Sequence, residues 1–358
     1  SKHHEGFCLW PNQQANQTWG RPWNSVDIGP KRDLLGDLTV AVRKQGLKMG
    51  YYYSLYEWFN PLWLKDKKRF IREHLHPQFK DLVTRYAPSV IFSDGEWDLP
   101  SSEWNAPELL AWLFNESPCK DEVVINDRWG KDERHKNGGY FTTEYGAGLP
   151  DASHPWEENR GMAHSFGYSR TEQLHDYRTG QELVWMLADL VSRGGNLLLD
   201  IGPTADGRIP VIMQDRLHEI GQWLKVNGEA IYGTAPTQTT CQWSDGQLPT
   251  QGFGQYKEKY DITKLVGQHP VNGQARKQAF FTLRGDTLYA ILPVWPGQTF
   301  TLKNVKTAPE SSVQLLGLPD NLPAQTLNGN LVITLPQLPP DQLPCKYAWT
   351  LKITRLTK

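Results

Sequence analysis

A chain of 358 residues is long enough for about two domains, and a hydrophobic fraction of 39% supplies a sizeable core. The 38 basic and 39 acidic residues nearly cancel, so nothing in the charge favours nucleic acid or an anionic membrane surface as a partner. No run of 18 apolar residues occurs, so we expect no membrane-spanning helix.

The first two-thirds of the chain alternates helix-like and strand-like segments. Apolar residues at helical spacing predict helices over 33–45, 70–86, 107–115, 181–192 and 213–227. Short runs rich in apolar or aromatic residues predict strands over 48–54, 89–94, 123–126 and 196–201. The run Val90-Ile91-Phe92 is too short and too β-branched for a helix. This alternation predicts an α/β fold with a parallel sheet, and we favour a closed (β/α)8-like barrel over a doubly wound sheet. No GxGxxG loop follows a strand, which argues against a dinucleotide cofactor.

The pattern changes near Thr234, after which helical spacing disappears. Short alternating runs separated by Gly, Pro, Asn and Asp cover 279–283, 287–294, 299–302, 313–316, 331–335 and 348–354. They predict an all-β antiparallel sandwich, with a hairpin turn at Gly285-Asp286. We therefore expect a barrel domain in residues 1–235 and a β-sandwich domain in residues 236–358.

Polar clusters follow the predicted strands. They are His3-His4-Glu5, Tyr51 to Trp58, Asp94 to Trp97, Asn126 to Gly130, Gly138 to Tyr145, Trp156 to Glu158, and Ser165 to Tyr168. Any one of them has an ordinary structural explanation, since an Asp after a strand most often caps a helix or closes a turn. Their repetition at the same end of successive βα units predicts a single site at the mouth of the barrel.

The residue types in these clusters suit a sugar. Asp94 ends a buried strand, close to Trp97, whose ring can stack on the C–H face of a sugar. Retaining glycosidases use two carboxyl groups about 5 Å apart, and Asp94 on a rigid strand end suits the nucleophile, with Arg128 keeping its pKa low. The proton shuttle should lie on a loop, where Glu144 and Glu157 both qualify and position alone does not separate them. The predicted hydrogen-bond donors to sugar hydroxyls are His3, His4 and Arg128.

Cysteine usage gives little support to a metal or redox site. The four cysteines are widely scattered and no CxxC pair occurs, which argues against zinc and thiol chemistry and leaves one disulfide open. The sequons at Asn16 and Asn115 permit glycosylation in a secretory compartment.

Several motifs taken together identify a family. They are His-His-Glu-Gly-Phe from His3, Trp-Asn-Ser-Val-Asp-Ile-Gly-Pro-Lys-Arg-Asp from Trp23, Ser-Asp-Gly-Glu-Trp from Ser93, Asn-Asp-Arg-Trp-Gly from Asn126, Ser-Phe-Gly-Tyr from Ser165, and Gly-Gly-Asn-Leu-Leu-Leu-Asp-Ile-Gly-Pro-Thr-Ala-Asp-Gly from Gly194. Over essentially the whole chain the sequence resembles α-L-fucosidases of glycoside hydrolase family twenty-nine, with the animal lysosomal (tissue) branch as the best match.

The resemblance implies a retaining exo-glycosidase that removes terminal α-L-fucose from glycans, with a catalytic barrel, a C-terminal β-sandwich and no metal or other cofactor. It implies Asp94 as nucleophile and Glu144 as acid/base, preferred over Glu157. The residues implied to contact fucose are His3, His4 and Arg128, with Phe166 against the methyl group, and Tyr53 is our choice among three adjacent tyrosines.

The family's barrel begins well before the His-His motif, so we expect this chain to be a fragment of a larger precursor that lacks the first barrel strands. The resemblance implies a lysosomal or secreted protein and a homo-oligomer.

Two alternative functions remain open at this point. One is a fucose-binding protein whose catalysis is impaired by the missing strands. The other is a retaining glycosidase for a different deoxysugar or a galactose-like substrate, although Phe166 favours a methyl group.

Overall fold

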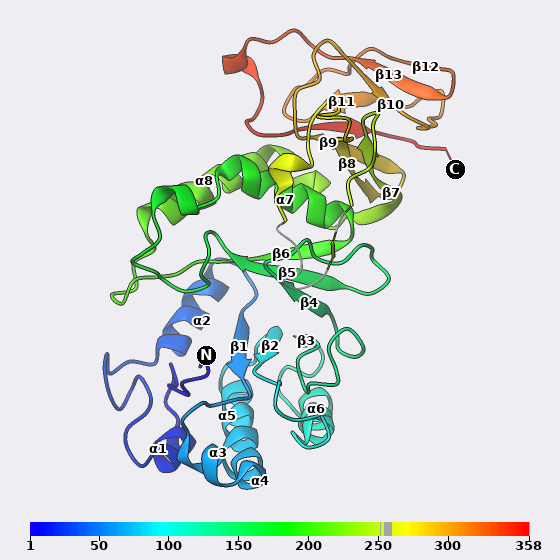
Figure 1. The fold of residues 1–358 in the computed structure, drawn as a ribbon. Coiled ribbons are helices and arrows are strands. Elements are labelled where there is room, and N and C mark those ends of the chain that lie inside the picture. The colour runs from blue at the N-terminus through cyan, green and yellow to red at the C-terminus, as the bar shows by residue number, and fades with distance from the viewer. Residues whose placement is uncertain (251, 254–259, 358) are drawn as a thin grey trace. The chain divides into compact units, whose positions relative to one another are not determined.

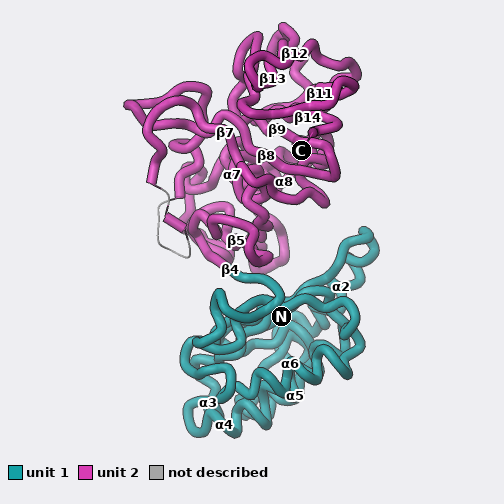
Figure 2. The backbone as a smooth tube through the Cα atoms, turned by 90° about the vertical axis from the view of Figure 1, so that its right-hand side faces the viewer, with its two compact units in different colours: residues 1–142 teal, residues 143–358 magenta. Residues whose placement is uncertain are grey.

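The computed structural model describes residues 1–250, 252–253 and 260–357, and the chain divides into two compact units, residues 1–142 and 143–358 (Figure 2). Each unit has its own hydrophobic core. In the first unit the core gathers residues from both ends of the segment, from Cys8 to Trp129.

The first unit is built on a parallel sheet in the order β1-β2-β3, with helices between the strands (Figure 1). Its strands are β1 (Gly50–Ser54), β2 (Val90–Asp94) and β3 (Val124–Ile125). Its helices are α1 (Gln13–Trp19), α2 (Leu34–Lys44), α3 (Pro61–Lys65), α4 (Lys67–Phe70), a π-helical turn (Ile71–Leu75), α5 (His76–Tyr86) and α6 (Ala106–Asn115). The strands and helices predicted here are confirmed, whereas α1, α3 and α4 were not predicted.

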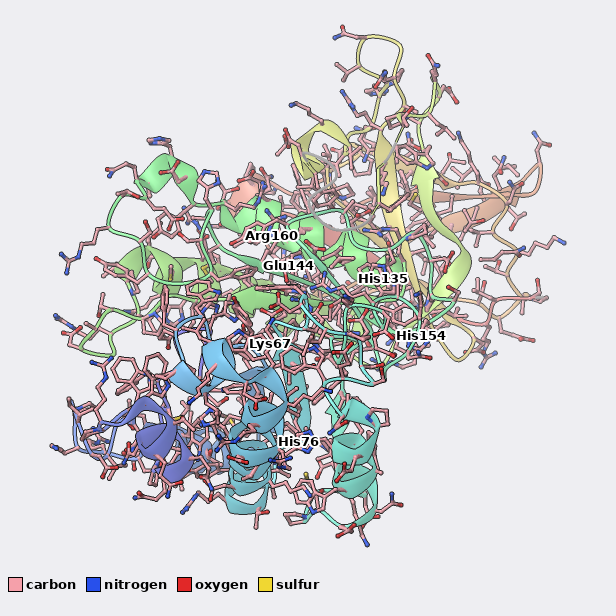
Figure 3. All side chains as sticks on the ribbon, turned by 60° about the horizontal axis from the view of Figure 1, so that its bottom comes forward. Lys67, His76, His135, Glu144, His154 and Arg160 are labelled. Carbon is pink, nitrogen blue, oxygen red and sulfur yellow. The ribbon has the colours of Figure 1, made fainter. Side chains whose placement is uncertain are left out.

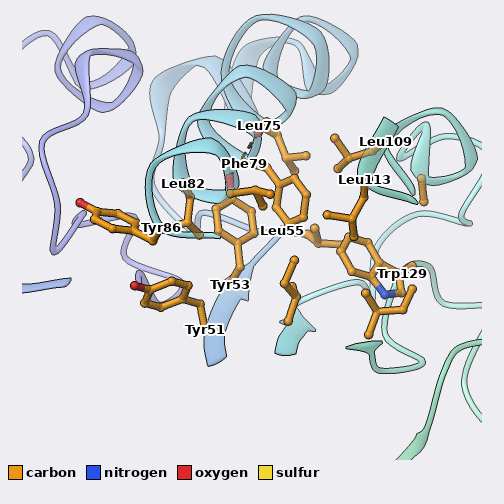
Figure 4. Packing of buried hydrophobic residues seen from close by; sticks show 14 of the residues in the cluster. Tyr51, Tyr53, Leu55, Leu75, Phe79, Leu82, Tyr86, Leu109, Leu113 and Trp129 are labelled. Atoms are coloured by element: carbon orange, nitrogen blue, oxygen red, sulfur yellow. Dashed lines mark hydrogen bonds between the residues drawn. The ribbon is translucent and has the colours of Figure 1, made fainter. Parts of the chain in front are cut away.

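The register of this sheet decides which side chains face the core. β1 pairs with β2 so that Ser54 lies opposite Asp94, and Tyr52 lies two residues earlier on the same face. Tyr53 lies on the other face, where its ring packs edge-on against Phe79 of α5 with the ring centroids 5.3 Å apart (Figure 4). The face that carries Asp94 is therefore opposite the face that packs on the helices.

The second unit begins with a sheet in the order β4-β5-β6, in which β5 and β6 are parallel. Its strands are β4 (Phe141–Glu144, which starts just before the unit boundary), β5 (Trp156–Gly161) and β6 (Gly195–Asp200). Its long helices are α7 (Gly180–Ser192) and α8 (Val211–Asn227), both close to the predicted bounds. β4 and β5 were not predicted as strands.

The C-terminal part is a sandwich of two antiparallel sheets, in the orders β11-β14-β9-β8-β7 and β10-β13-β12. The strands are β7 (Ala235–Trp243), β8 (Lys277–Arg284), β9 (Thr287–Leu292), β10 (Thr299–Leu302), β11 (Val313–Leu315), β12 (Ala324–Leu327), β13 (Asn330–Thr334) and β14 (Trp349–Ile353). β8 and β9 form the predicted hairpin, with Gly285 at a φ of 61° in its two-residue turn. Only β7 and β12 were not predicted.

Helix α7 connects the two parts of the second unit. It packs against β6 on one side and against β7 and β8 of the sandwich on the other (Figure 1). Short 3-10 turns lie at Leu174–Asp176, Gly228–Ala230, Ile262–Lys264 and Pro340–Gln342. β7 starts next to the domain boundary that we placed after residue 235, and that boundary stays a prediction.

All four cysteines are free thiols; Cys8, Cys119 and Cys241 are buried and Cys345 is partly buried. Among the described residues, no helix is long and apolar enough to cross a bilayer. In the same residues, no group of three His, Cys, Asp or Glu side chains is arranged to hold a metal ion.

Candidate active site

Asp94 is the last residue of β2, and the turn that follows it requires glycine. Gly95 has a φ of 73°, and a Cβ added there would lie 2.8 Å from the Cβ of Tyr56. The tight turn ends the strand at Asp94, whose side chain is mostly buried but retains a solvent-accessible edge of 11%.

Two donors hold the Asp94 carboxylate. The Tyr52 hydroxyl donates to Oδ2 at 2.7 Å, and Arg128 Nη1 donates to Oδ1 at 2.8 Å. Burial on its own raises the pKa of Asp94, but the Arg128 charge and the Tyr52 hydrogen bond outweigh it, and the pKa lies below its ordinary value. Asp94 is therefore ionised at neutral pH, as a nucleophile must be.

Arg128 is fixed by its own partners. Its Nε donates to Thr142 Oγ1 at 2.8 Å, and that hydroxyl donates to Asp127 Oδ1 at 2.8 Å. Its guanidinium lies over the ring of Phe92, 4.7 Å from the centroid. A buried guanidinium held on several sides presents its charge to Asp94 in one orientation.

His4 is oriented by Ser54. The Ser54 hydroxyl donates to the Tyr56 carbonyl at 2.7 Å, so it accepts from His4 Nδ1, also at 2.7 Å. This network assigns the proton to Nδ1 and leaves a lone pair on Nε2, which lies 3.7 Å from Asp94 Oδ2. Burial, assisted by the neighbouring His3, lowers the pKa of His4 to about 4. The neutral ring thus offers an acceptor to a hydroxyl group, where we expected a donor.

Aromatic rings surround this pair of histidines. The Trp97 ring lies 5.0 Å from His4, and the Trp58 ring lies 5.2 Å from it. Both indoles are about half exposed, at 49% and 43%. His3 is itself exposed and stacks on Tyr52 with a centroid distance of 5.6 Å. These exposed indole faces suit the C–H face of a sugar, and Trp58 is a member that we had not chosen as a site residue.

A buried carboxylate anchors the segment that carries the histidines. Glu57 pairs with Lys2 and with His74, whose Nε2 lies 2.7 Å from it. It also accepts hydrogen bonds from the side chains of Trp19 and Asn60. Burial raises the pKa of Glu57, but Lys2 and His74 outweigh it and hold the pKa far below its ordinary value. Since Lys2 directly precedes His3, this ion pair fixes the position of both histidines.

Tyr53 lies away from this cluster. Its hydroxyl donates to Gln78 Oε1 at 2.9 Å, and the side chain is fully buried in the core. The tyrosine that contacts Asp94 is Tyr52. The alternation of side chains along β1 is the signal that distinguishes the two, because Tyr52 shares a face with Ser54 at the end of the strand.

Both candidates for the proton shuttle lie in the second unit. Glu144 ends β4 and is buried, and Glu157 is partly buried on β5. Thr143 donates to Glu158 on one face of this sheet. Because side chains alternate along a strand, Glu144 and Glu157 both lie on the opposite face. The structure therefore groups the two candidates on one face without choosing between them.

A third carboxyl shares that face. Asp200 ends β6 and lies opposite Gly161, and Asn196 lies opposite Glu157 on the same face as that residue. Asp200 is four residues beyond Asn196, so its side chain returns to that face. Burial raises the pKa of Asp200 to about 6. Sequence analysis had treated this residue only as part of a strand-ending motif.

Phe166 packs beside the residue that follows Glu144. Its ring makes an edge contact with Tyr145, with the centroids 4.8 Å apart. Tyr145 has a φ of 47°, an unusual conformation for a bulky residue, and its hydroxyl accepts from Gly161 N at 3.0 Å. The guanidinium of Arg160, labelled with Glu144 in Figure 3, lies over the Tyr145 ring at 5.3 Å. The predicted methyl contact thus packs against Tyr145, the residue that follows the predicted shuttle in the chain.

Two family models match the chain. "Alpha-L-fucosidase" covers residues 1–229, and "Alpha-L-fucosidase C-terminal domain" covers residues 272–354. The tissue α-L-fucosidase of Mus musculus is 39% identical over 99% of this chain and 73% of its own length. The plasma α-L-fucosidase of Rattus norvegicus is 42% identical over 100% of this chain and 73% of its own length.

Solved structures give the same result. A Thermotoga maritima α-fucosidase in complex with a mechanism-based inhibitor has a TM-score of 0.74 at 28% identity, covering 99% of this chain and 74% of that one. An α-L-fucosynthase of the same organism has a TM-score of 0.75 at 29% identity, with 99% and 72% covered. This likeness confirms the predicted fold class, a (β/α) barrel followed by an antiparallel β domain, and it favours an active hydrolase over the binding-only alternative.

Proposed function

The chain belongs to the α-L-fucosidase family, and from that premise we propose that it removes terminal α-L-fucose from glycans through a covalent intermediate on Asp94. The observation that carries this assignment is the Asp94 carboxylate itself. It is kept ionised by Arg128 and Tyr52 at the end of a rigid strand, next to exposed indole rings. That combination suits attack on an anomeric carbon.

The proposed reaction has two displacements. In the first, an Asp94 oxygen bonds to the anomeric carbon while the bond to the leaving oxygen breaks, and Glu144 gives that oxygen its proton. In the second, the Glu144 carboxylate takes a proton from water, the water oxygen bonds to the anomeric carbon, and the bond to Asp94 breaks. Two inversions return the original configuration, so the product is α-L-fucose. Glu157 is the alternative shuttle.

Recognition of the sugar follows from the same cluster. His4 Nε2 suits a hydroxyl donor, and Arg128 suits a hydroxyl acceptor. Trp97 and Trp58 offer apolar faces to the ring, and we propose that Phe166 meets the 6-methyl group. His3 is the remaining proposed contact.

The test is hydrolysis of 4-nitrophenyl α-L-fucoside by the chain and by Asp94→Gly. We expect turnover by the parent and a loss of about 10⁴-fold or more in the variant, because the covalent step is removed. Added azide should restore release of 4-nitrophenol from Asp94→Gly and yield a fucosyl azide, since azide can enter the space left by the carboxylate.

Asp98→Asn is a matched control, because Asp98 lies four residues on and pairs with Lys67 at the surface. It should keep parental activity. A folded parent without turnover, or an Asp94→Gly variant that retains parental turnover, would refute the proposal.

The location of the protein, its oligomeric state and the bounds of its catalytic domain are also proposed here. We propose that the protein is lysosomal or secreted, a view supported by its likeness to tissue and plasma enzymes. We propose a homo-oligomer from the family resemblance, which light scattering on the purified protein tests. We propose that residues 1–235 form the catalytic domain, which the position of the first cut in limited proteolysis tests.

A further inference from the structure

The backbone of residues 145–149, which follow Glu144, is held by the side chains of two buried ionisable residues, Glu158 and Arg193. Glu158 accepts from Gly146 N at 2.7 Å. Arg193 donates to Ala147 O at 2.6 Å and also to Leu149 O. Gly148 has a φ of 72°, and a Cβ there would overlap the ring of a buried tryptophan. The backbone of this segment is therefore fixed by specific polar contacts and by close packing.

Arg193 is in turn held by a buried carboxylate. Its Nη2 donates to Asp189 Oδ2 at 2.9 Å, within the C-terminal turn of α7. Asp189 also accepts from the Tyr260 hydroxyl at 2.8 Å and from Lys277 Nζ. The side chains of Asp189, Arg193 and Lys277 are all under 5% exposed. Lys277 belongs to β8, so the sandwich supplies one of the two cations that balance this carboxylate.

We propose that Lys277, Asp189 and Arg193 are positioning residues through which the β-sandwich fixes the backbone next to Glu144 for proton transfer. The inference rests on the proposed role of Glu144. Each contact in the series is between buried charged or backbone groups, so none is replaced easily by water. A shift of the segment by about 1 Å is enough to slow a proton transfer strongly, because the shuttle must reach the leaving oxygen.

The geometry of Arg193 explains why a different cation would not serve as well. Its guanidinium fork reaches one carboxylate and two carbonyl groups at the same time. A lysine could keep the ion pair with Asp189 but could not make both carbonyl contacts. The Arg193→Lys variant should therefore lose support of the backbone of residues 145–149 while it keeps a positive charge beside Asp189.

The experiment compares two fucosides that differ in their need for acid catalysis. Phenyl α-L-fucoside has a poor leaving group that needs the proton, and 2-chloro-4-nitrophenyl α-L-fucoside has a good one that does not. Glu144→Ala calibrates the signature, with a fall in kcat/KM of about 10²–10⁴-fold on the phenyl substrate and a much smaller fall on the other. For Arg193→Lys we expect the same selective loss, about tenfold on the phenyl substrate.

Lys277→Met should show the selective loss more weakly, at about fivefold, because it acts through Asp189 and Arg193. Adding Lys277→Met to Arg193→Lys should lower activity by less than the product of the two single effects, since both act on one path. The control is Lys352→Met, which removes a sandwich ion pair with Glu229 that does not reach segment 145–149. It should affect both substrates equally and slightly.

The outcomes are distinguishable. If Glu144→Ala shows no leaving-group dependence, the proposed role of Glu144 fails. If Glu144→Ala shows it while folded Arg193→Lys and Lys277→Met lower both substrates equally or leave them unchanged, the positioning inference alone is refuted. Thermal melting of each variant identifies one that has not folded, and the remaining member of the pair then decides.

Discussion

Asp94 and Glu144 each end a strand, yet the side chains described around them act on different atoms. The partners of Asp94 bind the carboxylate itself, through Arg128 and Tyr52. The partners described for Glu144 bind the backbone that follows it, through Arg193. A nucleophile has to stay charged, so direct contact with a cation helps it. Glu144, which we propose as the proton shuttle, has to reach the leaving oxygen, so a fixed neighbouring backbone helps it.

Among the residues that support Asp94 and Glu144, removal of the Arg128 cation gives the largest expected change. Arg128→Met should lower kcat/KM by about 10²–10³-fold, since a charge-assisted hydrogen bond to the reacting group is lost. Because we propose that Asp94 reacts as the anion, activity should be present above its pKa and fall below it. Loss of the Arg128 charge raises that pKa, so the acid limb of the kcat/KM profile should move to higher pH. An unchanged acid limb in a folded variant would contradict the role assigned to Arg128.

The second prediction concerns Glu158, which accepts a hydrogen bond from Gly146 and makes the stability of the protein depend on pH. Burial raises the pKa of Glu158 from its ordinary 4.5 to about 7, against opposing hydrogen bonds from Thr143 and Gly146, which corresponds to roughly 3 kcal/mol. The folded protein therefore holds this proton more tightly than the unfolded chain, and its stability should fall as pH rises from about 4.5 to 7.

Glu158→Gln keeps the neutral shape, so it should remove that part of the pH dependence. The measurement is the free energy of unfolding in urea at several pH values, compared between the two proteins. Glu310→Gln, at a surface ion pair with Arg355, is the control and should follow the parent at every pH. Parallel curves for the parent and Glu158→Gln would show that Glu158 does not titrate in this range.

The smallest expected change in activity comes from Tyr52, and the same substitution at the adjacent Tyr53 should affect stability instead. Tyr52→Phe should lower kcat/KM by about tenfold and raise the acid limb slightly, because one hydrogen bond to Asp94 is lost. Tyr53→Phe should leave the acid limb unchanged and cost about 1 kcal/mol of stability, because its buried hydroxyl binds Gln78. A larger kinetic effect from Tyr53→Phe would reverse our assignment.

The sequence was sufficient wherever a strand is apolar and a cluster is contiguous. The run before Asp94 is β-branched and aromatic, so both β2 and the residue at its end were predictable. The Tyr52 position was within reach as well, since alternation along β1 decides it, but choosing Tyr53 ignored that period. In both cases the information is local.

Sequence reasoning failed where buried residues are polar. β5 reads Trp-Glu-Glu-Asn-Arg-Gly and has no apolar alternation, because its charges are satisfied by partners such as Thr143 and Gly146. The contact between Asp189 and Lys277 joins residues 88 positions apart, and neither residue stands in a recognisable motif. Such pairs are fixed by tertiary packing, so only a structure reveals them.

The four free cysteines also provide built-in reporters. Cys8 and Cys119 lie in the first unit, and Cys241 and Cys345 lie in the second. A buried thiol reacts with an alkylating reagent only when the structure around it opens. The order in which the buried thiols Cys8, Cys119 and Cys241 are alkylated, followed by mass spectrometry, would therefore report whether the two units open together or one before the other, with no engineered cysteine.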